Sequence, residues 1–88
     1  MKVMLGKDEY LDKVIHCVSV GDIIARATGH GVDTRVVVAA GNGGAMLRGS
    51  RHVTLFNLSG AEVGRYPATL SDEEIMKEHN AWETTRSI

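Results

Sequence analysis

Residues 49–67 read GSRHVTLFNLSGAEVGRYP, and this stretch predicts a β-hairpin. Apolar and polar residues alternate over residues 52–58, apart from Phe56, as they do in a strand with one buried face. Ser59-Gly60 then supplies a turn, and the chain returns as a partner strand that ends at Pro67. Two antiparallel strands are therefore expected at the centre of the chain.

The chain after the hairpin predicts a helix. Ser71 and Glu74 have the spacing of a capping box, in which each side chain accepts a hydrogen bond from the other residue's backbone N–H. Asp72 and Glu73 fall in the first turn, where the helix dipole favours negative charge. This helix is expected to run toward Trp82.

The segment before the hairpin is ambiguous between strand and helix. Three consecutive valines at 36–38 are β-branched and disfavour a helix, and Asn42-Gly43 is a two-residue hairpin signal. Both favour a strand that enters a turn. A helix over about residues 33–40, ended by the glycines that follow, stays open if tertiary packing overrides propensity.

Two helices are predicted at the N-terminal end. The first spans Asp8 to about Val18, because apolar residues recur at helical spacing: Tyr10, Leu11, Val14, Ile15 and Val18. The second begins at Ser19, which with Asp22 resembles a capping box, and ends at Gly29 or Gly31. A single bent helix, or a strand over residues 16–20, remains an alternative.

The fold class is therefore α+β, with an N-terminal helix or helices, an antiparallel β-hairpin or three-stranded sheet, and a C-terminal helix. The 88 residues predict a single small domain, near the lower size limit for a chain that folds alone, and a homodimer stays open. Its expected parts are a helical segment over residues 1–31, a β-rich core with the final helix over 32–82, and a tail over 83–88.

The composition of the chain indicates the cellular compartment in which it is expected. The lone Cys17 excludes an intrachain disulfide, and no apolar run is long enough to span a membrane or to form a signal peptide. A cytoplasmic protein is expected, in the host cytoplasm if the chain is phage-encoded. No membrane partner, no metal and no cofactor is expected, because the histidines and Cys17 lack zinc-ligand spacing and the glycines at 41–44 lack the lysine of a phosphate loop.

The charges are distributed unevenly. Residues 26–65 hold five arginines against two acids, a local net charge of +3, whereas the two ends together hold five basic residues against nine acids. The guanidinium fork of arginine binds phosphate through two hydrogen bonds. The sequence therefore predicts an anionic partner, RNA or DNA, for the central part of the chain.

His52 is the candidate catalytic residue. Cleavage of RNA by its own 2′-hydroxyl needs a group that moves a proton near neutral pH and a cation near the phosphate oxygens. His52 beside Arg51 and Arg48 has both. If the chain is an enzyme, the sequence predicts a metal-independent endoribonuclease.

Two motifs in this region resemble those of HicA-like toxins of actinobacterial and phage type. They are residues 49–56, with Gly60 behind them, and the Pro67–Asp72 entry to the last helix; the resemblance covers about residues 36–77. It implies a fold like that of the double-stranded-RNA-binding domain, mRNA cleavage by a single histidine, and silencing by an antitoxin partner. In the Gly-Ser-His form of the family's motif, Arg51 stands at the position of the histidine. His52 then comes one residue later, and on a strand this shift turns its side chain to the opposite face.

Carried over by position, the resemblance makes His52 the reactive residue and Gly49-Ser50 its supporting turn. The nucleic-acid-binding residues expected from charge and resemblance together are Arg35, Arg48, Gly49, Ser50, Arg51 and Arg65.

Two alternatives stay open. In a winged helix-turn-helix DNA-binding protein, residues 19–29 would form the first helix and turn, residues 32–40 the recognition helix, and residues 51–66 the wing. In a small phage-type inhibitor or adaptor, the hairpin edge or the acidic ends would bind a host protein.

Overall fold

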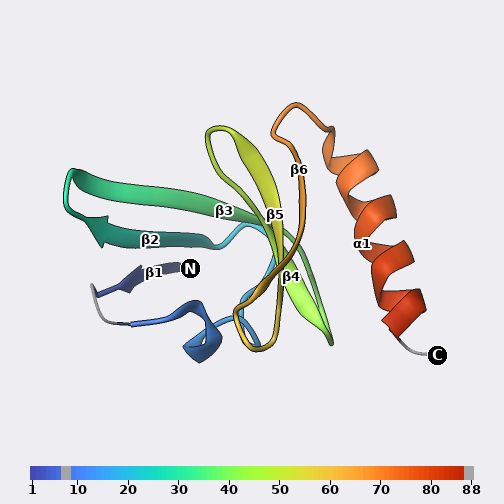
Figure 1. Cartoon of the computed structure of the whole chain (residues 1–88), viewed down its shortest axis with the longest axis horizontal. Coiled ribbons are helices and arrows are strands. Elements are labelled where there is room, and N and C mark those ends of the chain that lie inside the picture. Colours follow the sequence, from blue (N-terminus) through green and yellow to red (C-terminus); the bar gives the residue numbers. More distant parts are fainter. Residues whose placement is uncertain (7–8, 87–88) are drawn as a thin grey trace.

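The computed structural model describes residues 1–6 and 9–86, and its regular elements are mostly strands (Figure 1). In chain order they are β1 (Lys2–Leu5), the 3-10 turn η1 (Leu11–Lys13), β2 (Ile23–Thr28), β3 (Gly31–Gly41), β4 (Gly44–Arg48), β5 (His52–Asn57), β6 (Glu62–Pro67) and α1 (Asp72–Arg86).

The described strands form one six-stranded sheet in the order β1-β2-β3-β4-β5-β6. The pair β1–β2 is parallel, and every other pair is antiparallel. A parallel pair requires a connection that crosses the sheet, and the described residues 6 and 9–22 belong to it; we call them the crossover. The fold is therefore α+β, as predicted, but the sheet has six strands where two or three were expected.

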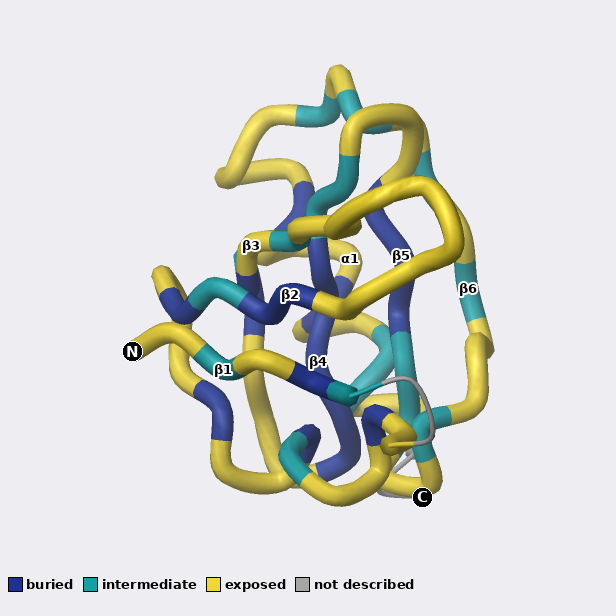
Figure 2. The backbone as a smooth tube through the Cα atoms, turned by 90° about the vertical axis from the view of Figure 1, so that its left-hand side faces the viewer, coloured by how far each residue is buried: buried dark blue, intermediate teal, exposed yellow. Residues whose placement is uncertain are grey.

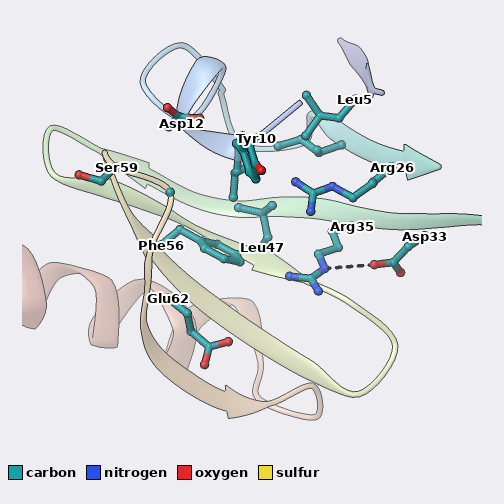
Figure 3. Close-up of a pocket in the computed structure, with 13 residues that line it drawn as sticks. Leu5, Tyr10, Asp12, Arg26, Asp33, Arg35, Leu47, Phe56, Ser59 and Glu62 are labelled. Atoms are coloured by element: carbon teal, nitrogen blue, oxygen red, sulfur yellow. Dashed lines mark ion pairs between the residues drawn. The ribbon is translucent and has the colours of Figure 1, made fainter. Parts of the chain in front are cut away.

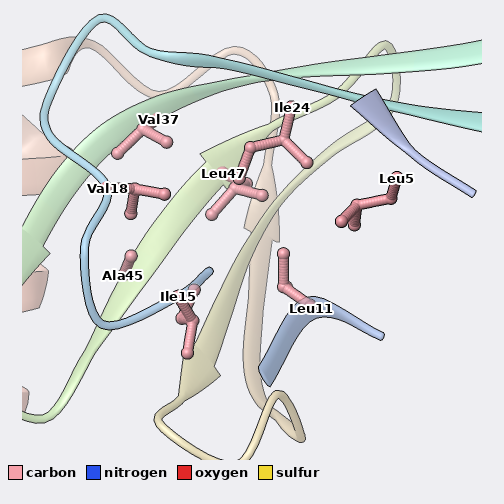
Figure 4. Close-up of a cluster of buried hydrophobic side chains, with 8 residues drawn as sticks. All are labelled: Leu5, Leu11, Ile15, Val18, Ile24, Val37, Ala45 and Leu47. Carbon is pink, nitrogen blue, oxygen red and sulfur yellow. The ribbon is translucent and has the colours of Figure 1, made fainter. Parts of the chain in front are cut away.

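The sheet is covered on its two faces by different segments. On one face the crossover packs against the sheet, and the buried cluster there consists of Leu5, Leu11, Ile15, Val18, Ile24, Val37, Ala45 and Leu47 (Figure 4). On the other face α1 packs against β3 and β4, around Ala39, Met46, Val53, Leu55 and Ile75. Strand β4 lies between these two layers and is almost wholly buried (Figure 2).

A bulge in β3 lets one strand serve both layers. The register between β3 and β4 shifts between Val37 and Ala39. In a regular strand, residues i and i+2, such as Val37 and Ala39, face the same side of the sheet, and a bulge breaks this rule. With it, Val37 faces the crossover and Ala39 faces α1.

The first predicted N-terminal helix is wrong. Asp8 lies outside the described residues, and from there to Val18 the structure has only η1 followed by turns. One bond of α-helical spacing forms, from the N–H of Ile15 to the carbonyl of Leu11 at 2.9 Å. The apolar spacing did identify the buried side, because Leu11, Ile15 and Val18 all face the sheet.

The second predicted helix is also wrong, because β2 occupies Ile23–Thr28. Ser19 and Asp22 do interact, but as a turn. The N–H of Ser19 donates to Asp22 Oδ2 at 2.9 Å, and the N–H of Asp22 donates to the Ser19 carbonyl at 3.0 Å. The amino group of Met1 also donates to Asp22 Oδ1 at 2.8 Å, so this carboxylate joins the crossover to the start of β1.

Residues 36–40 are strand, which resolves the ambiguity of the valine-rich segment. They belong to β3, and Asn42-Gly43 forms the predicted two-residue turn into β4. The helix considered over residues 33–40 is therefore absent. The recognition helix and the first helix of the winged helix-turn-helix alternative are both strands, so that alternative loses the elements that would read DNA.

The central hairpin and the C-terminal helix are confirmed. Strands β5 and β6 pair antiparallel, and Ser59-Gly60 lies in the turn between them. The capping box is formed, with the N–H of Glu74 donating to Ser71 Oγ at 3.2 Å and the N–H of Ser71 to Glu74 Oε1 at 3.3 Å. Helix α1 continues to Arg86, past residue 83, where the tail was expected to begin.

Within the described part of the chain, no helix combines the length and the apolar character that crossing a bilayer requires.

Candidate functional site

The face of the sheet that carries the crossover is only partly covered. The β2–β3 hairpin projects away from α1 (Figure 1), and on it the residues next to the buried Ile24 and Val37 on the same face are charged: Arg26, Asp33 and Arg35. Register places Ile24 opposite Arg35 and Arg26 opposite Asp33. A polar, solvent-accessible surface therefore extends from the edge of the buried cluster.

This surface is hollowed beside the β4–β5 turn. The hollow has a volume of about 210 Å³ and is lined by Asp33, Arg35, Gly49, Ser50, Arg51, His52, Thr54, Glu62 and Arg65. We call it the arginine hollow. Six of the seven residues predicted from the sequence lie in it, brought from β3, the β4–β5 turn, β5 and β6.

Backbone hydrogen bonds hold the β4–β5 turn, which forms one edge of the hollow, in place. The N–H of Gly49 donates to the carbonyl of His52 at 2.8 Å, which closes the β4–β5 turn. The N–H of Ala68 approaches the carbonyl of Arg51 at 3.4 Å, so the end of β6 lies against the same turn. Ser50 and Arg51 are therefore held at the solvent-exposed tip.

Two arginines of the hollow form exposed ion pairs. Arg35 Nε lies 3.6 Å from Asp33 Oδ2, and Arg65 Nη2 lies 2.9 Å from Glu62 Oε1. All four side chains are between 38% and 56% exposed. Exposed pairs of this kind contribute only about 0–1 kcal/mol, so either arginine can exchange its carboxylate for another anion at little cost.

His52 lies in the hollow with Arg51 and Arg65. It begins β5, opposite Pro67, and it shares a face with Thr54, which pairs with Arg65. Alternation along β5 therefore directs His52 to the arginines rather than toward α1. Among the described residues, no carboxylate forms an ion pair or a hydrogen bond with its ring, so within that part of the chain the imidazole has no carboxylate to orient it.

Arg48 is the predicted residue that the structure places elsewhere. It lies on the α1 face of the sheet, where its Nη2 donates to the Leu70 carbonyl at 2.7 Å and to Asp72 Oδ1 at 3.1 Å. Arg48 thus anchors the loop that leads into α1 and does not line the hollow.

Sequence reasoning missed four residues that line this surface: Arg26, Asp33, Thr54 and Glu62. Arg26 was assigned to a helix. The available signal was the Gly29–Gly31 segment, because a glycine-rich turn between two polar, β-compatible stretches is typical of a hairpin. In the structure, Thr28 Oγ1 donates to the Gly31 carbonyl at 3.1 Å and closes that turn.

Among residues 1–6 and 9–86, no three histidine, cysteine, aspartate or glutamate side chains are grouped closely enough to hold a metal ion. Comparison of the chain with protein-family models, with curated proteins and with solved structures finds no match.

Proposed function

We propose that this protein binds single-stranded nucleic acid on the open part of the sheet, with the arginine hollow as the phosphate site. The observation that carries the proposal is the convergence of Arg35, Arg51 and Arg65 with His52 in one hollow, from three separate parts of the chain. Arginine forks from β3, the β4–β5 turn and β6 suit the repeated phosphates of an extended backbone.

The charges of this face favour an anion. The arginine hollow contains three arginines against the carboxylates of Asp33 and Glu62, which leaves a net charge of +1. The carboxylates are partners in weak, exposed ion pairs, and a phosphate offers a bidentate replacement.

A single strand fits this surface better than a duplex. Proteins that read the major groove insert a helix or a two-stranded ribbon. The β2–β3 hairpin is such a ribbon, so binding of duplex DNA is the competing outcome that the assay below includes. Helix α1, the one α-helix of the described residues, lies on the opposite face and begins with three acids, Asp72, Glu73 and Glu74, which repel phosphate. A flexible strand, in contrast, can follow the hollow across β3, β5 and β6.

Binding is tested by fluorescence anisotropy with short single-stranded RNA, single-stranded DNA and duplex DNA over a range of salt concentrations. Arg35→Gln and Arg65→Gln are expected to weaken single-strand binding and to reduce the salt slope by roughly one phosphate contact each. Lys77→Gln is the matched control, because Lys77 is an exposed cation on α1. Equal losses in all three variants would indicate a nonspecific effect of net charge, and no binding by the wild type would reject the proposal.

A second candidate activity, RNA cleavage, is favoured by the position of His52 beside Arg51 and Arg65. The imidazole would accept the proton of the 2′-hydroxyl as its oxygen bonds to phosphorus, and an arginine would offset the charge that develops on the phosphorus oxygens. The bond from phosphorus to the 5′-oxygen breaks, the leaving 5′-oxygen takes the proton back from the imidazolium, and a 2′,3′-cyclic phosphate remains. His52→Ala is expected to abolish cleavage while single-strand affinity is retained. His30→Ala, an exposed histidine in the β2–β3 turn, is the control. Uncleaved RNA with the wild-type protein limits the function to binding.

A further inference from the structure

A larger cavity adjoins the arginine hollow where the crossover meets the sheet (Figure 3). Its volume is about 410 Å³, within the usual range for small-molecule sites. It shares Asp33, Arg35 and Glu62 with the hollow. Arg35 thus stands at the boundary of two cavities, and a ligand that reaches into both would pass this guanidinium.

The floor of this cavity, which we call the crossover pocket, is apolar, whereas polar side chains line the rest of it. Its apolar lining comes from five different elements and consists of Leu5, Leu11, Ile24, Leu47 and Phe56. Tyr10 of the crossover stands above Leu47 in Figure 3, and it remains 71% exposed. Tyr10 therefore offers an exposed aromatic ring at a cavity whose floor is apolar, and a flat group can stack on such a ring.

The rim of the crossover pocket is charged and carries both signs. Arg26 and Arg35 extend from one side, and Figure 3 shows their guanidinium groups at the same end of the pocket. Arg26 makes only a long hydrogen bond, 3.5 Å to the Glu9 carbonyl. Asp12 and Glu62 supply carboxylate oxygens elsewhere on the rim. The preferred ligand is therefore flat and apolar in its body, anionic at one end, and able to donate hydrogen bonds from its edge.

We infer that the crossover pocket binds one nucleobase, with the phosphate of the same nucleotide on Arg35. This inference rests on the proposed function, and it assigns the base-binding part of the site. The Arg35 guanidinium lies over the Phe56 ring, with its carbon 5.8 Å from the ring centroid, so the phosphate-binding group and an aromatic ring meet at this end of the pocket. The amino and imino groups of a base can donate to Asp12 or Glu62. A nucleotide unit has all three chemical features in one molecule.

The first experiment compares Tyr10→Ser with Val20→Ser in binding to short single-stranded RNA. Both are exposed apolar residues of the crossover, but only Tyr10 lines the pocket. Loss of one base–aromatic contact is expected to weaken binding about tenfold in Tyr10→Ser and to leave Val20→Ser unchanged. The same RNA with one abasic nucleotide, moved along the strand, should bind the wild type about tenfold more weakly at one position and show no further loss with Tyr10→Ser.

The outcomes separate this inference from the proposed function. If Tyr10→Ser and the abasic strands bind as tightly as their controls while Arg35→Gln still weakens binding, single-strand binding stands and the base pocket is overturned. If no single strand binds, both fail.

Free nucleotides and strands are distinguished by nuclear magnetic resonance of the ¹⁵N-labelled full chain titrated with the four nucleoside monophosphates. Saturable shifts at the amides of Leu47, Phe56 and Gly60 would show that the pocket also accepts a free nucleotide. Absence of such shifts together with a position-specific abasic effect would show that it accepts a base only within a strand. Absence of both overturns the inference.

Discussion

The N–H of Gly43 donates to Glu83 Oε1 at 3.0 Å, so the β3–β4 turn is bound to the last turns of α1 forty residues further along the chain. His79 Nε2 lies 3.5 Å from the same carboxylate oxygen, and His79 is only 3% exposed. Gly41 allows this approach, because a Cβ there would lie 2.8 Å from His79 Cε1. Glu83 is therefore a structural residue of the α1 face.

We expect Glu83→Ala to lower the free energy of unfolding by about 1–2 kcal/mol, because a charge-assisted hydrogen bond to a partly buried N–H is lost. Glu83→Gln keeps an acceptor oxygen and should lose less than Glu83→Ala. Urea denaturation measures both, with Glu78→Ala as the control at an exposed position of the same helix. An equal loss for Glu78 and Glu83 would contradict the role of this contact.

Gly44 should tolerate no side chain. Its φ is +156°, and a Cβ would overlap the Phe56 carbonyl oxygen and lie 3.0 Å from Asn57 Cα, both backbone atoms of the neighbouring strand. Gly44→Ala is expected to cost about 2–4 kcal/mol in the free energy of unfolding, because β4 and β5 must separate locally. Gly29→Ala, where a Cβ meets nothing within 4 Å, should change stability by less than about 0.5 kcal/mol.

Asp22 should make stability depend on acid pH. Hydrogen bonds from the Met1 amino group and then from the Ser19 N–H hold the pKa of Asp22 below its ordinary value of 3.8. Because the lowered pKa belongs to the folded state, the stabilisation is present above about pH 4 and is lost as the pH falls through the lowered value.

The measurement is urea denaturation of the wild type and Asp22→Asn at several pH values, on a chain with a free Met1 amino group. The wild type should be more stable than Asp22→Asn at pH 7, and the two should converge below pH 4. A difference that does not change with pH would show that ionisation of Asp22 is not its source.

Substitutions of Arg48 and Arg51 should have opposite effects: the first should lower the stability of the fold, and the second should weaken single-strand binding. Arg48→Gln removes the donors to the Leu70 carbonyl and Asp72 and should destabilise the fold by about 1–2 kcal/mol, with single-strand affinity unchanged. Arg51→Gln should leave the denaturation midpoint unchanged and weaken single-strand binding, because Arg51 is exposed in the arginine hollow. Reversed effects would place the nucleic-acid site on the α1 face.

The parts of the fold that could be predicted are those specified by local chemistry. The Asn42-Gly43 turn, the Ser59-Gly60 turn and the Ser71–Glu74 capping box each act within a few residues, and all three form where predicted. Strand β1 gave no comparable signal, because its four residues pair with β2, which lies beyond the whole crossover.

The predicted N-terminal helices failed because the same apolar spacing serves two structures. Leu11, Ile15 and Val18 recur as they would on one face of a helix, and a turn-rich segment lying across a sheet buries them equally well. Tertiary packing decided between these structures, and no residue within the segment could do so.

The residue types of the candidate site could be predicted from the sequence. The face of the sheet on which each residue lies could not. Arginine and histidine indicated the hollow, and six of seven predicted residues line it. Arg48 could not be assigned to a face, because β4 is buried on both sides and Ala45, Met46 and Leu47 are all apolar. Such a strand has no polar alternation from which its orientation can be read.

The order of the strands has a consequence for how this chain reaches its fold. From β2 to β6 each strand pairs with the next one along the chain, so these hairpins close short loops and can form early. Strand β1 is the exception, because residues 6–22 separate it from β2. Synthesis from the N-terminus delivers β1 first, yet it must wait for β2 to provide an edge. Strand β1 is then among the last of the six strands to dock, although it precedes the others along the chain, and the crossover pocket is completed only at that step.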